Sequence, residues 1–333
     1  MQNMDFKRYN SITNSYDEEF VAKVKELSYD GPWYVSEKIH GANCQLSVTE
    51  DGVEIGGRNQ ITDNELMRQE LLKYAEKASA LFNSITVRRI ILFGEFFGGQ
   101  YPHKDVPRDK EAKKVQKGVW YSPHNHVLFF DLFIEPLTGK PYYANLSNFR
   151  YLLGYFDIPR VGFKRLKTFE EALNYPNDEL SEIYKLYDLP EIENNIREGV
   201  VIRPETDLWI GDTRVIIKNK NERFKEVWKE RRPVVDQKEL TEKQIDVLGD
   251  MLRYVTECRA VSILSHYGTS LSMKVLGPFI KDMNTEVIQE FEKYNNVFNS
   301  MEKTEIKEIT RRVNKKVSEI CKKVLTEQLK EDK

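Results

Sequence analysis

Apolar residues are spaced in two different ways along this chain, and the spacing limits the folds that it can adopt. Up to about residue 235, short runs of β-branched and aromatic residues are bounded by Gly, Pro, Asn and Asp, which is typical of strands. From about residue 240, apolar residues recur three or four positions apart, which is typical of amphipathic helices. A chain of 333 residues also exceeds what one core usually organises, so we expect two domains.

The first part is expected to form an α+β domain. Strands are predicted at 33–37, 44–49, 52–57, 90–97, 126–134, 199–203 and 214–218, and helices at 63–82, 147–156, 167–174 and 178–187. The runs 44–49 and 52–57 are close enough to form a β-hairpin across Glu50-Asp51. Because helices are inserted unevenly among the strands and regular βαβ alternation is missing, antiparallel sheets are expected.

The last part is expected to be a small all-helical domain. Residues 241–244 (TEKQ) have the form of a capping box, followed by apolar residues at 245, 248, 252 and 255 and a stop at Gly268. Between Ile306 and Val324 the 3–4 spacing continues for more than five turns and predicts a helix that packs on its own domain, with a coiled-coil partner as the alternative. The predicted domains are therefore 1–233 and 236–333, linked at 231–233 (RRP).

Composition excludes several classes of protein. There is no apolar run of about 18 residues and no signal peptide, so we expect no membrane partner and a cytoplasmic location. Three distant cysteines argue against a disulfide framework. The net charge of −2 conceals an uneven distribution of charge along the chain. Residues 170–198 include nine acidic and two basic residues, whereas residues 214–232 include eight basic and three acidic ones. Such local patches, rather than the sum, bind polyanions.

One lysine lies in a loop between two predicted strands, in residues 37–43 (EKIHGAN). Lys38 alone predicts little, because most loop lysines are merely solvated. Its significance comes from the ordered set that follows: Arg58, residues 93–96 (FGEF), 129–131 (FFD), 198–203 (EGVVIR) and 217–221 (IKNKN). A glutamate inside a hydrophobic strand, as at Glu95, is costly unless it is paired or functional.

Lys218 and Lys220 stand two positions apart and face the same way in an extended chain, which implies a shared anion, with a solvated edge strand as the alternative. A lysine amine can store a nucleotide only when it is neutral, because the protonated form cannot attack phosphorus. Neighbouring cations and partial burial favour the neutral form.

In this order the motifs resemble the covalent nucleotidyltransferases, the superfamily of ATP-dependent DNA and RNA ligases and mRNA capping enzymes. The EKIHGAN form of the lysine motif, and residues 253–259 (RYVTECR) in a helical C-terminal domain, are similar to the RNA ligase 2 family of phage-type and RNA-editing-type ligases. The resemblance implies an ATP-grasp-like nucleotidyltransferase domain with antiparallel sheets, followed by a helical RNA-engaging domain. It also implies the cofactors ATP and Mg²⁺ (or Mn²⁺).

The resemblance assigns a role to each motif. Lys38 would take AMP from ATP, pass it to an RNA 5′-phosphate and so allow joining to a 3′-OH at a nick in duplex RNA, by a monomeric enzyme. Phe130 would stack on adenine, Glu37 would read the purine edge through its backbone and Glu95 would contact the ribose. Glu198, with Glu95, would hold the metal through waters. The remaining assignments are phosphate contacts for Lys218, Lys220 and Arg58, active-site positions for His40, Asn43 and Arg203, and RNA binding for Arg259.

Three positions depart from the family's pattern. Arg203 stands where a lysine is common, and its planar fork changes the contacts that it can make. Ala42 stands where a threonine hydroxyl is common. The acidic residue that the family pairs with the counterpart of Arg259 has no clear match, Glu286 being nearest. These departures bear on sealing more than on adenylation.

Other interpretations stay open at this stage. A capping-type guanylyltransferase or a DNA ligase would share the motifs, but both usually carry an OB barrel where this chain is predicted to be helical. An inactive RNA-binding module is the alternative from another class. We expect His124 and His126 to be surface or core residues rather than metal ligands, and the stretch Lys104–Lys117 to be either RNA-facing or merely solvated.

Overall fold

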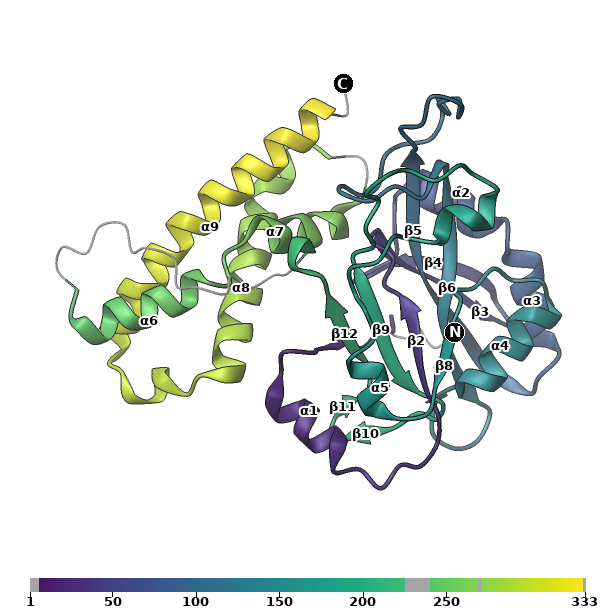
Figure 1. Ribbon diagram of the computed structural model, residues 1–333, viewed down its shortest axis with the longest axis horizontal. Coiled ribbons are helices and arrows are strands. Elements are labelled where there is room, and N and C mark those ends of the chain that lie inside the picture. The colour runs from purple at the N-terminus through teal and green to yellow at the C-terminus, as the bar shows by residue number, and fades with distance from the viewer. Residues whose placement is uncertain (1–5, 225–239, 269–270, 332–333) are drawn as a thin grey trace. The chain divides into compact units, whose positions relative to one another are not determined.

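The computed structural model describes residues 6–224, 240–268 and 271–331 (Figure 1). These residues fall into two compact units, Met1–Arg223 and Phe224–Lys333. The predicted linker at 231–233 lies outside the described residues. None of the described helices is long and apolar enough to cross a bilayer.

Two five-stranded sheets form the first unit, which confirms the α+β prediction. The first sheet has the order β1-β12-β9-β2-β8 and is antiparallel except where β1 runs parallel to β12. Its strands are β1 (Thr13–Asn14), β12 (Ile217–Lys220), β9 (Gly199–Pro204), β2 (Trp33–Glu37) and β8 (Lys164–Leu166).

The second sheet is antiparallel throughout, with the order β4-β3-β5-β6-β7. Its strands are β4 (Gly52–Gly57), β3 (Ala42–Thr49), β5 (Val87–Gln100), β6 (Ser122–Pro136) and β7 (Tyr142–Tyr143). Thr49 pairs with Gly52 across Glu50-Asp51, so the predicted hairpin is confirmed. A small ribbon, β10 (Trp209–Ile210) with β11 (Thr213–Arg214), completes the strands of this unit.

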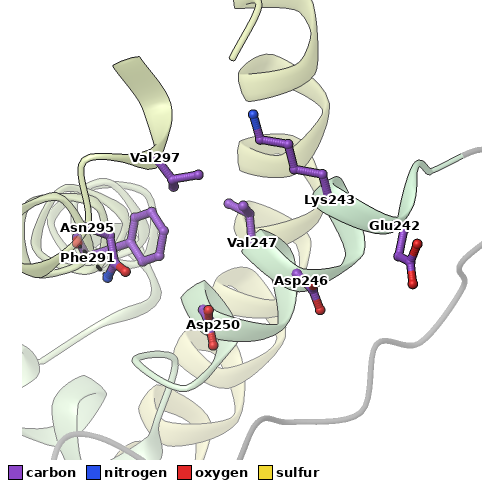
Figure 2. Close-up of a pocket in the computed structure, with 8 residues that line it drawn as sticks. All are labelled: Glu242, Lys243, Asp246, Val247, Asp250, Phe291, Asn295 and Val297. Atoms are coloured by element: carbon purple, nitrogen blue, oxygen red, sulfur yellow. Dashed lines mark hydrogen bonds between the residues drawn. The ribbon is translucent and has the colours of Figure 1, made fainter. Parts of the chain in front are cut away.

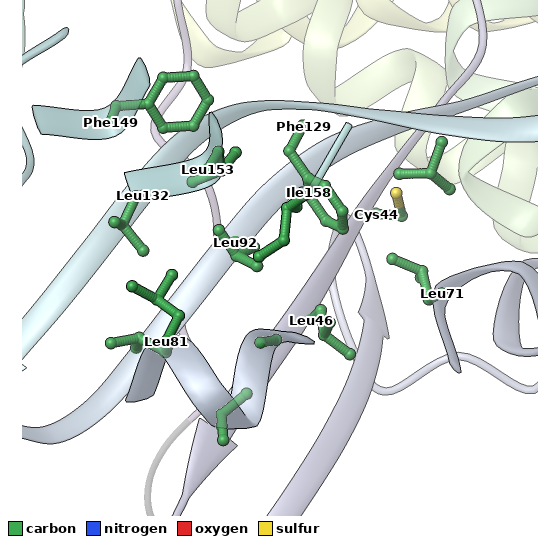
Figure 3. Packing of buried hydrophobic residues seen from close by; sticks show 14 of the residues in the cluster. Cys44, Leu46, Leu71, Leu81, Leu92, Phe129, Leu132, Phe149, Leu153 and Ile158 are labelled. Atoms are coloured by element: carbon green, nitrogen blue, oxygen red, sulfur yellow. The ribbon is translucent and has the colours of Figure 1, made fainter. Parts of the chain in front are cut away.

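Helices cover the outer face of each sheet. The core of the second sheet lies under α2 (Glu65–Leu72), α3 (Ala75–Asn83) and α4 (Leu146–Tyr155). Figure 3 shows Cys44 of β3 near Leu71 of α2, and Leu92 of β5 near Leu153 of α4, within one core. The core of the first sheet lies under α1 (Glu18–Lys25) and α5 (Phe169–Leu173).

Three predicted elements of the first unit differ from the structure. The helix expected at 63–82 is two helices, because the chain turns at Tyr74, whose ring packs edge-on against Phe129. The helix expected at 178–187 is only a 3₁₀ turn at Ile183–Tyr187, since Ser181 and Glu182 donate their backbone N–H groups to Asn195 and Glu37 instead. The strand expected at 214–218 is divided between β11 and β12.

The described part of the second unit contains helices and no strand. These helices are α6 (Glu242–Leu252), α7 (Glu257–Leu264), α8 (Leu276–Tyr294) and α9 (Lys303–Glu331). The capping box at Thr241 and Gln244 is present, but the helix that it starts ends at Leu252, and Thr256 caps a separate helix. Apolar residues of α9, including Ile309, Val313 and Val317, are buried in this unit's own core, as the spacing predicted.

Candidate nucleotidyl-transfer site

Lys38 lies within a cluster of charged side chains that converge on one buried carboxylate. The Lys38 Nζ lies 2.8 Å from Glu198 Oε2, and His40 Nδ1 lies 3.4 Å from the same oxygen. The other oxygen of Glu198 is 2.9 Å from Lys220 Nζ. Burial alone would raise the pKa of Glu198, but the charges of Lys220, Lys38 and His40 outweigh it and hold that pKa well below its usual range. The cluster therefore holds a permanent anion between two lysines.

The register of the first sheet brings these residues together. Lys220 pairs with Gly199, Glu37 pairs with Val200, and the Lys38 N–H donates to the Gly199 carbonyl at 2.9 Å. The ends of β2, β9 and β12 therefore coincide. After Lys38 the chain runs against β5 so closely that a Cβ on Gly41 would overlap the Phe96 carbonyl oxygen, which explains the glycine.

Alternation along the strands places the charged residues on the inner face of the first sheet. The outer core contains Val35, Ile202 and Ile217. Arg203 and Lys218 follow the last two directly and Lys38 stands three positions after the first, so alternation points all three to the opposite face. Lys218 shares this face with Lys220 and is half-buried. The prediction that both lysines face the same way agrees with the strand register.

The second sheet contributes two polar side chains from the face opposite its helices. Cys44 and Phe96 belong to its outer core, so Asn43 and Glu95, which pair across β3 and β5, lie on the other face. Burial raises the pKa of Glu95 to about 7, opposed in part by the positive charges of Lys38 and Arg58. Arg58 follows β4 directly. A Cβ on Gly41, three positions after Lys38, would lie 3.1 Å from Glu95 Cγ, so the loop of Lys38 and strand β5 of the second sheet meet at this site.

Phe130 and Arg203 belong to a neighbouring network that joins the two sheets. Its centre is Asp131, a fully buried residue that forms ion pairs with Arg214 and, at 3.4 Å, with Arg203. Arg203 also donates to the Phe130 carbonyl at 3.2 Å. The strand β6 bulges at Phe130, since Phe93 pairs with Asp131 whereas Gly94 pairs with Phe129. Arg203 thus holds the backbone that carries Phe130.

Two tyrosines that no sequence motif predicted contribute to the site. Tyr9 donates to Asp131 Oδ2 at 2.8 Å, and its ring packs edge-on against Phe130 at 5.1 Å between centroids. Tyr121 is fully buried, and its Oη accepts the N–H of His40 at 2.9 Å. Tyr9 therefore supports the network around Phe130, and Tyr121 fixes the loop that carries Lys38. Neither tyrosine lies in a motif that indicates this contact.

Glu37 faces away from the cluster. One of its carboxylate oxygens accepts the N–H of Glu182 at 3.1 Å. Burial raises the pKa of Glu37 to about 7, opposed in part by hydrogen bonds from Ser181 and Glu182. The side chain is therefore placed to hold the segment before η1 (Ile183–Tyr187), which leaves only its backbone toward the site.

We expect Glu37→Gln to make the free energy of unfolding less dependent on pH. A carboxyl whose folded pKa lies near 7, against an ordinary 4.5, stabilises the fold at low pH and loses that contribution as pH rises through the folded pKa. Between these two pKa values, the free energy of unfolding of the wild type should fall by about 1–3 kcal/mol more than that of the variant. Urea unfolding at several pH values measures this difference, with Glu54→Gln at an exposed position as the control. Parallel pH profiles of Glu37→Gln and wild type would contradict the burial argument.

The described residues hold no group of three or more His, Cys, Asp or Glu side chains that would form a metal site by itself. His124 bonds to Asp109 at 2.7 Å, and His126 stacks on Tyr187 with ring centroids 3.9 Å apart. Burial lowers the pKa of His126 to about 4. These histidines are engaged in local contacts.

Arg259 lies in the second unit, near the start of α7. Its side chain is only 3% exposed, and Nη1 lies 3.6 Å from Glu286 Oε2 on α8. Glu286 is therefore its acidic partner in the structure. The RNA contact of Arg259 stays a prediction, and the buried guanidinium would have to act through the packing of α7 on α8.

The same unit contains a shallow cavity of about 430 Å³ beside α6 (Figure 2). Val247, Phe291 and Val297 contribute apolar surface to this cavity, and the acidic residues Glu242, Asp246 and Asp250 of α6 also line it. No residue of the lysine cluster lines it.

Two family models match the chain. Residues 31–220 match the RNA ligase family, and residues 237–319 match the T4 RNA ligase 2 C-terminal family. The chain belongs to the RNA ligase family. The second match supports the RNA ligase 2 branch, so the resemblance identified from the motifs is confirmed.

Individual relatives are distant. The RNA-editing ligase 2 of Trypanosoma brucei brucei mitochondria is 25% identical over 151 residues, which cover 38% of this chain and 36% of that protein. A Naegleria gruberi RNA ligase structure is 16% identical with a TM-score of 0.47, covering 66% of this chain and 57% of that one. Another structure of a Naegleria gruberi RNA ligase, with ATP and Mn, is 14% identical with a TM-score of 0.45 over the same shares. This chain thus spans about a third of the curated relative and little more than half of these structures.

Proposed function

We propose that the protein is an ATP-dependent RNA ligase that carries AMP on Lys38 and seals nicks in duplex RNA. The observation that carries the proposal is the convergence of Lys38, His40 and Lys220 on the buried carboxylate of Glu198. A nucleophilic amine beside a fixed cation and a carboxylate is what transfer of a nucleotidyl group to lysine requires. Membership of the RNA ligase family supplies the substrate class.

The first step in this proposal is attack of the Lys38 amine on the α-phosphorus of ATP. The nitrogen–phosphorus bond forms as the bond from the α-phosphorus to the bridging oxygen of pyrophosphate breaks, pyrophosphate leaves with that electron pair, and the proton of the amine passes to solvent. Only the neutral amine attacks, so the ion pair of Lys38 with Glu198 must open as the nucleotide binds. Lys220 and Lys218 lie on the same face of β12, where they would hold the nucleotide phosphates.

The remaining residues would bind and orient the nucleotide. Phe130 would stack on adenine from the bulge in β6, and Glu95 would contact the ribose from the facing strand. Arg58 would touch the AMP phosphate and later the RNA end, with Asn43 opposite Glu95 as a further contact. In the later steps AMP passes to the RNA 5′-phosphate, and the 3′-OH displaces AMP as the phosphodiester forms.

The carboxylates suit a divalent cation such as Mg²⁺ or Mn²⁺. Glu198 is held ionised, and Glu95 lies close enough for the negative charge of Glu198 to raise its pKa further. Magnesium commonly binds through one or two carboxylates and completes its shell with waters and substrate phosphates. Glu198 and Glu95 would hold such an ion, which when bound neutralises charge on the phosphates.

The two units would divide the work. The first, predicted as 1–233, would form the adenylylated lysine, and the second, predicted as 236–333, would engage RNA, with Arg259 as a candidate contributor. The protein would act as a monomer on a nick with a 3′-OH and a 5′-phosphate.

Sealing of a nicked RNA duplex tests this function. Incubated with ATP and Mg²⁺, the protein should convert a labelled 5′-phosphate strand into the joined product. A duplex without the 5′-phosphate is the control, because it offers no acceptor for AMP, and it should stay unjoined. Joining of duplexes that carry RNA or DNA on each side of the break would show whether the enzyme accepts DNA strands. A protein that adenylylates itself but joins none of these duplexes is not the ligase proposed.

A further inference from the structure

The loop between β5 and β6, residues 101–121, carries most of its charge in one sign. It contains six basic and three acidic residues, a net charge of +3 in a chain whose net charge is −2. Lys104, Arg108, Lys110 and Lys113 are exposed. The loop projects beyond the ends of the two strands, in the upper part of Figure 1.

Side chains of the flanking strands fix the course of this loop. Asn125 on β6 accepts the N–H of Lys113 at 3.0 Å and donates to its carbonyl at 2.8 Å. Gln116 accepts the N–H of Gly98 at 3.0 Å, and the N–H of Val115 donates to the Gly98 carbonyl at 3.1 Å. Beside them, a Cβ on Gly99 would overlap the Lys113 carbonyl, so the loop backbone lies directly on β5. The loop is thus held against the strands at residues 113–116, and Asp109, between Arg108 and Lys110, is hydrogen-bonded to His124 of β6 at 2.7 Å. Attachment at these places lowers the entropic cost of binding.

The base of the loop borders the lysine cluster. Tyr121, its last residue, accepts the N–H of His40, two positions after Lys38. Trp120 exchanges two hydrogen bonds with the Asn195 side chain, at 2.9 and 2.7 Å, three positions before Glu198. The exposed cations therefore extend outward from the place where the RNA end would react.

We propose that the β5–β6 loop is a binding surface for the phosphate backbone of the RNA strand beside the break. Phosphates spaced along a duplex are bound by Lys and Arg side chains through release of counterions, with no need for a particular base sequence. The proposal rests on the proposed function, because it takes RNA as the substrate. It concerns RNA outside the reacting groups, so adenylylation of Lys38 by ATP alone does not depend on it.

The test compares two variants with the same loss of charge. The loop variant replaces Lys104, Arg108, Lys110 and Lys113 by Gln. The control variant replaces four exposed basic residues of the same unit outside the loop by Gln: Arg88, Lys140, Arg150 and Lys167. Filter binding of a nicked RNA duplex at several salt concentrations gives the apparent Kd and its salt dependence for each protein.

We expect the loop variant to bind RNA about 10-fold or more weakly at ~0.1 M salt and to lose about 0.7–0.9 of the log–log salt slope for each phosphate contact removed. Its covalent labelling by ATP should equal that of wild type. Unchanged affinity and slope, or an equal loss in the control variant, would overturn the proposal. The binding assay needs no catalysis, so a wild type that binds RNA through the loop but seals nothing refutes the ligase function alone.

A second variant makes the loop more positive instead of less positive. Asp105→Asn with Glu111→Gln removes two exposed acidic residues from the loop and should tighten RNA binding several-fold with a steeper salt slope. If the fourfold variant also loses covalent labelling, its fold is in doubt and this variant decides. Binding that does not tighten would then overturn the proposal.

Discussion

Lys38→Ala should abolish covalent labelling of the protein by [α-³²P]ATP, with a loss of at least ~10³-fold in the rate of nucleotidyl transfer. Both lysines pair with Glu198, but the side chain of Lys38 is more exposed than that of Lys220, 19% against 9%, so we expect the Lys38 amine to be the nucleophile. The measurement is the acid-stable label retained on the protein after incubation with ATP and Mg²⁺. Labelling of ordinary strength in this variant would contradict the role of Lys38.

Lys38→Arg is the matched control for charge. Arginine retains a cation opposite Glu198 but cannot deprotonate at accessible pH, so it cannot serve as the nucleophile. We expect Lys38→Arg to be unlabelled as well, while its thermal stability stays near that of wild type. This result would separate the chemistry of the amine from the electrostatic support that it gives to the buried carboxylate.

Asp131→Asn should destabilise the first unit by about 3 kcal/mol or more. Asp131 is completely buried and is the shared partner of Arg203 and Arg214, with a further hydrogen bond from Tyr9. Without its charge, the buried guanidinium groups of Arg203 on β9 and Arg214 on β11 lose the anion that they share. Urea unfolding followed by tryptophan fluorescence measures the loss, since Trp33, Trp120 and Trp209 all lie in this unit.

Asp157→Asn is the control, because it makes the same chemical change in an exposed ion pair. Asp157 lies 2.7 Å from Lys77, with its side chain 93% exposed. Exposed pairs contribute about 0–1 kcal/mol, so this variant should unfold nearly as wild type does. Equal effects of the two substitutions would mean that the buried network does not hold the sheets together.

Much of the site follows from the sequence because its motifs stand at strand ends. The strands β2 and β4 were predicted within their observed bounds, and β9 within one residue. Once these strands pair, Lys38, Glu198 and Lys220 must meet, since adjacent antiparallel strands share their ends. The position of the motifs at strand ends is therefore enough to bring these residues together once the strands pair.

The supporting residues could not be found in this way. Tyr9 reaches Asp131 over 122 positions, and Tyr121 reaches His40 over 81. Such contacts depend on how the two sheets face each other, which no local pattern encodes. The same limit applies to Arg203, which the motif order placed among the active-site candidates but whose pairing with Asp131 on the facing sheet no local pattern indicates. Local rules also missed the break in 63–82, where the packing of Tyr74 on Phe129 outweighs helix propensity.

Locating the modified residue in the wild-type protein tests the central claim most directly. After incubation with ATP and Mg²⁺, the protein is digested and its peptides are mapped by mass spectrometry for the added mass of one AMP. The account predicts a single adenylylated peptide, with the modification on Lys38. AMP found on Lys218, Lys220 or another residue, with Lys38 unmodified, would contradict it.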